Sequence, residues 1–305
     1  RECRAPALKT TTQRYGVSEL CVTSLHIYPV KGLHALSPPT AMVSPWGLEG
    51  DRRWMVVDAT GRFITQRTCR SMALITPIPT AEGLTLTRAG MRPCPVRFPD
   101  QESPVLLTTV WKDQVQARDA GDLAAAWLEQ ALGQPCRLVW MHRPEFARIR
   151  HLGEQERPVS FADGYPLLLA NTASLDDLTA RLPAGQSVPM SRFRANIVLG
   201  GHIPWAEDGW RRLAIGDGAN GGGAIVRVLA PCSRCVVTSI DQESAQVPFP
   251  KEPLATLASF RRAQGGVMFA QNAVVEKAGL ISVGDRVSVL EEGASNLLEV
   301  PGKLA

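Results

Sequence analysis

Two cysteines close together, Cys232 and Cys235, are the residues of this sequence whose type and spacing most readily suggest chemistry. They lie between an apolar run that ends at Leu229 and another that begins at Val236. Thiolates bind soft metal ions and take part in redox exchange. Burial as ordinary core residues is an equally common outcome for two such cysteines. By itself, the pair leaves a functional site and a structural role evenly balanced.

Two familiar uses of a cysteine pair fit this sequence poorly. Structural zinc needs four ligands, but there is no second cysteine pair, and the five histidines have no paired ligand spacing. A thioredoxin-type pair precedes a helix whose N-terminus lowers the thiol pKa, whereas the β-branched residues 236–240 predict a strand. A thiol redox role stays open as the less favoured alternative. The odd total of seven cysteines, widely scattered, favours reduced thiols.

The elements that would position this pair are a mixture of strands and helices. Alternating or β-branched runs predict strands at residues 21–28, 53–57, 84–88, 105–110, 195–199, 224–229 and 285–290. Helices are predicted at residues 119–132, from Ser174 with Asp177 in a capping box, and after Pro253. This order indicates an α+β fold with β-barrel character, not an alternating βαβ chain.

Two further features of the sequence have ordinary structural interpretations. The glycine-rich residues 216–223 lack the Gly-Lys-Ser/Thr ending of a phosphate loop and lead into a predicted strand, so we expect a hairpin connection. The seven tryptophans are mostly expected in the core.

Composition sets broad limits on function and location. A chain of 305 residues with 45% hydrophobic and 20% charged residues is long enough for two globular domains. The net charge is +4 and no run of like charges occurs, so we do not expect a nucleic-acid surface. No apolar stretch has the length of a transmembrane segment, and the N-terminus lacks a secretion signal, so a cytoplasmic location is expected. Residues 1–18 are interpreted as a tail or an expression remnant.

Several short motifs follow one another along nearly the full chain. They are IYPVK (27–31), GDRRW (50–54), RDAG (118–121), SRFRANIV (191–198), IGD (215–217), CSRC (232–235), KEPL (251–254) and VGD (283–285). In order and spacing they resemble the MOSC family, in particular the mitochondrial amidoxime reducing component and its bacterial relatives. The resemblance implies a β-barrel-rich MOSC fold, with an N-terminal MOSC-type β-barrel domain at residues 19–143 and a MOSC domain at residues 144–305.

The same resemblance implies a molybdenum–molybdopterin cofactor. Its dithiolene supplies two sulfurs to the metal, so the protein adds one soft ligand, and its phosphate needs cations or backbone N–H groups. Cys235 matches the family's metal-binding cysteine. Lys31, Arg52 and Arg194 match the basic cofactor-binding positions. Asn196 matches an amide that binds the cofactor.

A lysine or arginine taken singly is usually a solvated surface charge. Arg194 is the exception, because its apolar neighbours would make an unpaired guanidinium costly.

The segment Asp163-Gly164-Tyr165 resembles the family segment that approaches the metal and pterin from the other side. Asp163 is predicted to act in proton transfer at the metal, although a turn aspartate is an equally common use of this residue. Family hydroxyl residues are replaced here by Gly164 and Tyr165, and another by Gly32. Those cofactor contacts therefore pass to backbone N–H groups or are lost. Residues 65–67 resemble another cofactor-facing segment.

The implied activity is the reduction of N-hydroxylated small molecules, such as amidoximes and hydroxylamines, by a molybdenum-dependent oxidoreductase. No cysteine follows Cys235, so a ferredoxin-type relay is not expected, and electrons would come from a separate flavoprotein reductase, ferredoxin or cytochrome. Two other classes stay open: a non-catalytic carrier of molybdenum cofactor or sulfur on Cys235, and a thiol redox protein.

Overall fold

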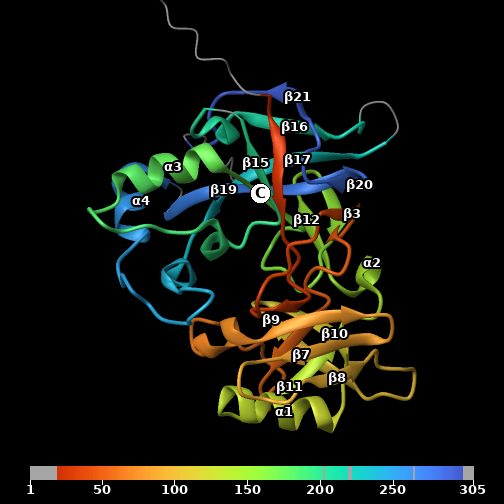
Figure 1. Cartoon of the computed structure of the whole chain (residues 1–305). Coiled ribbons are helices and arrows are strands. Elements are labelled where there is room, and N and C mark those ends of the chain that lie inside the picture. Colours follow the sequence, from red (N-terminus) through yellow and green to blue (C-terminus); the bar gives the residue numbers. More distant parts are fainter. Residues whose placement is uncertain (1–18, 202, 219–221, 264, 298–305) are drawn as a thin grey trace, which may run out of the picture.

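The computed structural model describes residues 19–201, 203–218, 222–263 and 265–297 of the chain. Figure 1 shows two lobes: an upper one drawn mainly in green and blue, and a lower one of orange to yellow strands with a helix. Strands dominate and short helices are interspersed, which confirms the predicted α+β class. The predicted tail, residues 1–18, lies outside the described residues.

The upper lobe, which we call the barrel lobe, is built on an eight-stranded sheet. Its order is β1 (Cys21–Leu25), β15 (Ile197–Gly200), β14 (Leu167–Asn171), β19 (Gly266–Lys277), β17 (Ala224–Ser233), β16 (Trp210–Ile215) and β21 (Val287–Glu292), with β18 (Arg262–Ala263) paired to β19. Backbone hydrogen bonds then join the two ends of this path. Val22 N–H donates to Asp285 O at 2.9 Å, and Val287 N–H donates to Leu20 O at 2.8 Å. This seam closes the sheet into a barrel.

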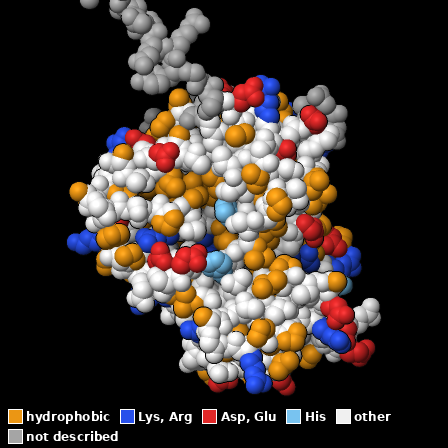
Figure 2. Space-filling view, in the orientation of Figure 1, with side chains coloured by type: hydrophobic (Ala, Val, Ile, Leu, Met, Phe, Trp, Pro, Cys, Tyr) orange, Lys and Arg blue, Asp and Glu red, His pale blue; other side chains and the backbone are white. Residues whose placement is uncertain are grey.

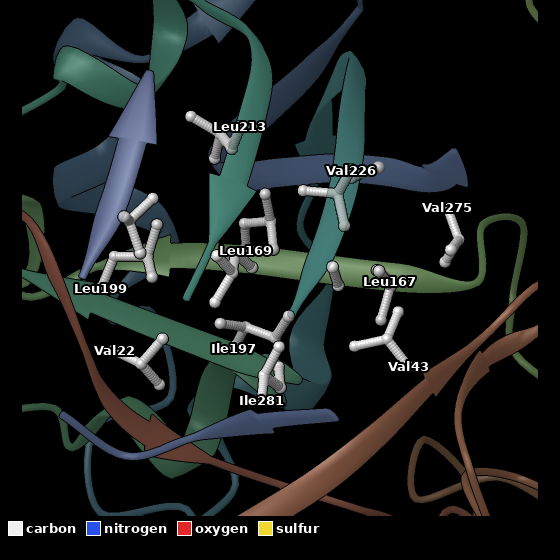
Figure 3. Close-up of a cluster of buried hydrophobic side chains, with 14 of the residues drawn as sticks. Val22, Val43, Leu167, Leu169, Ile197, Leu199, Leu213, Val226, Val275 and Ile281 are labelled. Carbon is white, nitrogen blue, oxygen red and sulfur yellow. The ribbon is translucent and has the colours of Figure 1, made fainter. Parts of the chain in front are cut away.

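Aliphatic side chains from the inner faces of these strands fill the barrel. Figure 3 shows them gathered between the strands, with Leu169 and Ile197 near the middle of the cluster and Leu213 toward its upper side. All three are fully buried, and each such side chain contributes about 1.5–3 kcal/mol by leaving water. The core also includes Val22, which lies on the first strand of the chain. Residues at both ends of the described chain therefore share one core.

A small sheet beside the barrel is also shared between distant parts of the chain. It consists of β20 (Gly279–Ser282), β3 (Thr40–Ser44) and β4 (Gly47–Leu48). Strands β1, β3 and β4 precede residue 144 in sequence but lie in the barrel lobe. A boundary near residue 144 therefore separates two segments of the sequence, but the sheets of the barrel lobe contain strands from both segments.

The lower lobe, which we call the N-terminal lobe, contains two further sheets. The first has the order β2 (Val30–Lys31), β5 (Trp54–Val57), β11 (Arg137–Trp140), β10 (Asp113–Asp119) and β9 (Val105–Val110). The second consists of β6 (Thr76–Thr80), β7 (Gly83–Thr87) and β8 (Cys94–Arg97). Helix α1 (Asp122–Leu132) packs Ala124, Leu128 and Ala131 into this lobe and ends at Gly133, whose φ is 73°. The predicted helix and its glycine end are confirmed.

The remaining elements are short. A hairpin of β12 (Ile149–Leu152) and β13 (Gln155–Pro158) follows α2 (Pro144–Ala147), and α3 (Thr172–Arg181) and α4 (Leu254–Phe260) lie on the side of the barrel near β19 (Figure 1). Turns of 3-10 helix occur at Arg70–Leu74, Met190–Phe193, Ala206–Asp208 and Val236–Ser239. Within the described residues, no helix is long and apolar enough to cross a membrane.

Two local predictions are wrong. Residues 236–240 do not form a strand: after Ser233, the last residue of β17, the chain leaves the sheet, and Val236–Ser239 is a 3-10 helix. Helix α3 begins before Ser174, because the Asn171 side chain accepts the Ala173 N–H at 3.0 Å and caps the helix there. Ile215 of β16 pairs with Ala224 of β17, so the two strands form the antiparallel pair predicted on either side of residues 216–223, of which residues 219–221 lie outside the described part of the chain.

The barrel core provides a direct test of this packing. Leu213→Ala leaves a cavity in the centre of the barrel, and we expect the free energy of unfolding to fall by about 2–5 kcal/mol in chemical denaturation. Leu290→Ala on the neighbouring strand β21 is the control, because Leu290 is exposed, and we expect a loss under about 1 kcal/mol. Equal losses for the two variants would contradict the barrel as described.

Candidate functional site

A cavity with about 910 Å³ of empty space, partly open to solvent, contains residues from both lobes in its walls. All of the residues predicted from the sequence line it: Lys31, Gly32, Arg52, Asp163, Gly164, Tyr165, Arg194, Asn196 and Cys235. Residues 65–67 line it too. A concave space with several convergent polar side chains is typical of a site for a cofactor or small molecule.

Strand ends and the loops next to them supply these side chains. Lys31 is the last residue of β2, and Arg52 precedes β5. The loop of residues 163–165 leads into β14, and Arg194 follows the 3-10 helix Met190–Phe193. Cys235 follows the end of β17. Rigid strands thus hold loop residues around one space, which is a common way to build a binding site.

Cys235 presents a free thiol to the cavity. Its side chain is partly exposed and forms no disulfide. The Cys235 backbone carbonyl accepts hydrogen bonds from Thr238 N–H at 3.0 Å and from Thr238 Oγ1 at 2.8 Å, which fixes the turn that follows it. The backbone is therefore held while the sulfur stays available to a ligand.

Cys232 also lines the cavity, and Arg234 Nη1 lies 2.9 Å from its sulfur. Arg234 Nη2 donates to Phe193 O at 2.6 Å, which links the cysteine turn to the 3-10 helix before Arg194. The buried Nε of Arg234 has no hydrogen-bond partner among the described residues. Arg234 is a cavity residue to which the sequence analysis assigned no role, although it lies within the CSRC motif.

Two guanidinium groups of the cavity wall lie against one buried aromatic ring, that of Tyr28. The ring of Tyr28 is 4.5 Å from Arg52 Cζ and 4.2 Å from Arg194 Cζ, both distances taken to the ring centroid. Tyr28 is fully buried, and its hydroxyl donates to Ala195 O at 3.2 Å. Cation–π attraction to this ring offsets part of the cost of placing two positive charges close together.

Arg52 has a carboxylate partner. Its Nη1 donates to Asp51 Oδ2 at 2.5 Å and to Asn196 Oδ1 at 3.1 Å. Burial tends to lower the pKa of Arg52, but the Asp51 carboxylate, together with Tyr28 and Asp163, outweighs burial, and the pKa lies above its ordinary value. Asn196, almost fully buried, also accepts the Leu168 N–H and donates to His26 O. In this structure the Asn196 amide positions Arg52 and the barrel strands.

Arg194 differs from Arg52, because only neutral groups bind its guanidinium. Nη1 donates to Gln242 Oε1 at 3.1 Å and Nη2 donates to Leu33 O at 2.9 Å. Among the described residues no carboxylate forms an ion pair with it. Burial lowers the pKa of Arg194 to about 10, so the group remains positive at neutral pH. A partly buried cation without a counter-ion favours an anionic ligand.

A buried pair of side-chain amides connects Arg194 to Gly32, which also lines the cavity. The side chains of Gln66 and Gln242 exchange two hydrogen bonds of 3.0 Å, and Gln66 Nε2 also donates to Gly32 O at 2.8 Å. Gly32 has a φ of 83°, and a Cβ at this position would lie 2.9 Å from Met72 Cε. A side chain at residue 32 would therefore be strained, which accounts for glycine here.

Lys31 and Asp163 form an ion pair at the cavity wall. Lys31 Nζ donates to Asp163 Oδ1 at 2.5 Å and to Phe161 O at 2.8 Å. Burial lowers the pKa of Lys31, and the Asp163 carboxylate offsets part of that effect. Although burial opposes it, Lys31 holds the pKa of Asp163 well below the ordinary 3.8. Asp163 is therefore a carboxylate at neutral pH, which suits accepting hydrogen bonds more than donating a proton.

Arg148 positions the loop that carries Asp163. This almost fully buried residue donates to Asp113 Oδ2 at 2.8 Å, to Ser160 O and Asp163 O at 3.1 Å each, and to Ala162 O. This role of Arg148 could not be predicted from the sequence, because its partners are a distant carboxylate and ordinary backbone carbonyls.

Gly164 and Tyr165 follow Asp163 at the cavity surface. A Cβ on Gly164 would meet no atom within 4 Å, so there is open space in front of this residue. Tyr165 is partly buried against Leu152 and its neighbours, and burial raises its pKa. Neither residue offers the small hydroxyl expected of the family at these positions.

The charge balance of the cavity is strongly positive. Five lining residues are cationic, namely Lys31, Arg52, Arg67, Arg194 and Arg234, whereas Asp163 is the one acidic lining residue in the described part of the chain. On the face shown in Figure 2, acidic and basic side chains are interspersed, so the positive charge is a property of the cavity rather than of that surface. An anion such as a phosphate group fits this environment.

The donor set limits how a metal would be bound. Within the described ranges, no group of three or more His, Cys, Asp and Glu side chains gathers in one place. A metal at Cys235 would thus receive its other donor atoms from an organic ligand. The sulfur, the cations and the open space in front of Gly164 fit a ligand that carries its own sulfur atoms and a phosphate.

The fold and the cavity together define a two-lobe β-barrel protein with a cationic pocket that contains a thiol. Residues 19–135 match the MOSC N-terminal beta barrel domain, and residues 156–288 match the MOSC domain. The chain therefore belongs to the MOSC family, as its motifs predict.

Its curated relatives carry two kinds of name. Mitochondrial amidoxime-reducing component 1 of Mus musculus is 34% identical over 287 residues, covering 88% of this chain and 82% of that protein. The Homo sapiens protein of the same name is 33% identical over 290 residues with the same coverage. Molybdenum cofactor sulfurase of Oryza sativa subsp. japonica is 30% identical over 271 residues, covering 83% of this chain. The match spans 32% of the length of that sulfurase.

The Lys31–Asp163 ion pair predicts a pH-dependent stability. Asp163→Asn should lower the free energy of unfolding at pH 7 by about 0.5–1 kcal/mol, a modest amount because the carboxylate is open to solvent in the cavity. Since the folded pKa of Asp163 is depressed, this difference is fully present above about pH 5 and shrinks as the pH falls below 3.8. Chemical denaturation of both proteins from pH 7 to pH 3 measures it.

Glu82→Gln is the control for this measurement, because Glu82 forms an ion pair with Arg97 in which both side chains are highly exposed. We expect a difference of under about 0.5 kcal/mol at every pH. An Asp163→Asn difference that does not change between pH 7 and pH 3 would contradict the ion pair as its source.

Proposed function

We propose that this protein binds a molybdenum–pterin cofactor in the cavity and reduces N-hydroxylated small molecules, such as amidoximes and hydroxylamines, with electrons from a separate donor protein. The observation that carries the proposal is a free thiol, Cys235, in a cavity whose lining has five cations and one carboxylate. The amidoxime-reducing names of the mouse and human relatives support it.

The chain's own residues suggest how the cofactor would be held. Cys235 Sγ is the soft ligand for the metal. Arg194 has a guanidinium bound only by neutral acceptors, so it is the first candidate for the phosphate. Lys31 Nζ uses two of its three N–H donors on protein oxygens, which leaves one for a ligand. Backbone N–H groups near Gly32 and Gly164 are further candidates.

When bound, a molybdenum centre supplies two-electron chemistry in which an oxygen atom leaves nitrogen. Water release in this reaction also requires protons, and Asp163 stays our candidate in proton transfer. Because Lys31 keeps the Asp163 carboxylate ionised, the proton of this pair is held on Lys31 Nζ. Asp163 then orients that proton, while Arg148 and the carbonyls it binds fix the loop. Proposed donors are a flavoprotein reductase, a ferredoxin or a cytochrome.

A second candidate function is a non-catalytic carrier of the molybdenum cofactor or of sulfur on Cys235. The similarity to molybdenum cofactor sulfurase, at 30% identity, favours considering it. A carrier and a reductase share the same cavity and the same thiol. Turnover of an N-hydroxylated substrate distinguishes them.

The central test compares the wild type with Cys235→Ser. Serine keeps the size of the side chain but removes the soft ligand, so we expect bound molybdenum to fall at least about tenfold. Reduction of benzamidoxime with reduced viologen as artificial donor should fall by at least about 100-fold. Metal analysis and product chromatography measure the two effects on protein of matched folded content.

Cys232→Ser is the matched variant. A metal ligand at Cys235 predicts that Cys232→Ser keeps most of the molybdenum and turnover, whereas a dithiol redox protein would lose turnover with either change. Molybdenum without any turnover in the wild type would favour the carrier. Unaltered turnover in Cys235→Ser would exclude the proposed ligand.

Arg194 and Arg192 form an informative pair of neighbouring arginines. Arg194→Met should reduce cofactor content by about tenfold or more, with little change in the melting temperature of the apoprotein, because no carboxylate is left unpaired. Arg192 is buried and binds Asp241 at 3.2 Å. Arg192→Met should lower the free energy of unfolding by about 1–3 kcal/mol and leave the cofactor content of folded protein unchanged. The opposite pattern would show that Arg194 is a structural cation.

A further inference from the structure

Trp111 has an unusual backbone conformation at the edge of the cavity. Val110 of β9 pairs with Asp113 of β10, so Trp111 is the first residue of a two-residue turn. Its φ is +57°, in the left-handed region that bulky residues rarely adopt. Tight hairpins usually place glycine or asparagine where φ is positive. Strain of this kind persists where neighbouring contacts enforce it, and it is often found at ligand sites.

Three contacts hold the indole at the cavity. Trp111 Nε1 donates to Asp163 Oδ1 at 3.0 Å, and the Phe63 ring lies 5.0 Å away in an edge-to-face arrangement. The guanidinium of Arg67 lies over the indole at 4.8 Å from the ring centroid. Trp111 is nevertheless 38% exposed and lines the cavity. In Figure 1, β9 and β10 lie on the side of the N-terminal lobe that faces the barrel lobe.

The contact with Arg67 indicates that the Trp111 ring can stack against a flat, delocalised group. The Arg67 guanidinium is planar and delocalised, and within the described chain no ion pair or side-chain hydrogen bond ties it down. Arg67 can therefore move from the ring without breaking an ion pair. A flat conjugated ligand can then stack on the indole in its place or beside it.

We propose that Trp111, with Phe63 and Arg67, forms an aromatic subsite that selects substrates whose N–O group is attached to a planar aromatic ring. This inference rests on the proposed function for the identity of the reacting group. The indole is hydrogen-bonded to Asp163, so a ring stacked on it lies next to the loop of residues 163–165. Aliphatic N-hydroxylated compounds reach the same cavity but gain nothing from the subsite.

The test measures binding directly, by calorimetry with benzamidoxime and acetamidoxime as the aromatic and aliphatic probes. We expect Trp111→Leu to weaken binding of benzamidoxime by about tenfold and binding of acetamidoxime by less than about twofold. Trp127→Leu is the matched control: Trp127 is also partly buried, its indole N–H donates to Arg92 O at 2.7 Å, and it lies on α1 outside the cavity lining. It should bind both probes as the wild type does.

Trp111→Gly is a second variant that guards against misfolding, because glycine adopts a positive φ without strain. It should retain the wild-type fold by circular dichroism and show the same selective loss as Trp111→Leu. In the cofactor-loaded enzyme, both variants should raise KM for benzamidoxime about tenfold and KM for acetamidoxime by less than about twofold.

The outcomes separate this inference from the proposed function. Selective loss of benzamidoxime binding in a protein that reduces neither probe supports the subsite and overturns the proposed reductase. Reduction of both probes with no change in selectivity in either Trp111 variant supports the reductase and overturns the subsite. Equal weakening of binding for both probes would mean that Trp111 acts only by positioning the loop that carries Asp163. That result would also overturn the subsite.

Discussion

Positive charge held away from water is the constraint on which the rest of this site depends. Arg52 is balanced by Asp51, and Lys31 by Asp163, but Arg194 is bound only by neutral acceptors and the face of Tyr28. This arrangement is electrostatically unfavourable, and the packing of the barrel, which fixes the groups in place, offsets that free energy. An anionic ligand would therefore be stabilised by the positive charge of Arg194, which no carboxylate of the described residues pairs with. The thiol at Cys235 then gives such a ligand a second, chemically different point of attachment.

The cavity belongs to neither lobe alone. Its key interactions join residues far apart in sequence: Lys31 with Asp163, Trp111 with the same carboxylate, and Gln66 with Gln242. A small shift of one lobe against the other would break several hydrogen bonds together. The relative position of the lobes is therefore part of the binding site.

The sequence predicted more of the site than of its surroundings. Motif order located Lys31, Arg52, Arg194 and Cys235, which line one cavity in the structure, because residues grouped at one site leave a recognisable pattern of types and spacings. The sequence could not show that Trp111 lies outside the core. A positive φ in a turn can be predicted for glycine or asparagine, but not for tryptophan. The prediction of a strand at residues 236–240 was wrong because it depends on a neighbouring strand that the local sequence does not reveal. β-branched residues favour a sheet only where a neighbouring strand is available, and β19 no longer pairs with the chain there.

The seam of the barrel has a consequence for biosynthesis. Its two sides, near Leu20 and Val287, are separated by most of the described chain, so the barrel cannot close until residue 287 has left the ribosome. The N-terminal lobe, whose strands lie between residues 30 and 140, is complete long before that. Until then the seam-side edge of β1 stays unpaired, even after its other edge has paired with β15, and an open strand edge is prone to aggregation.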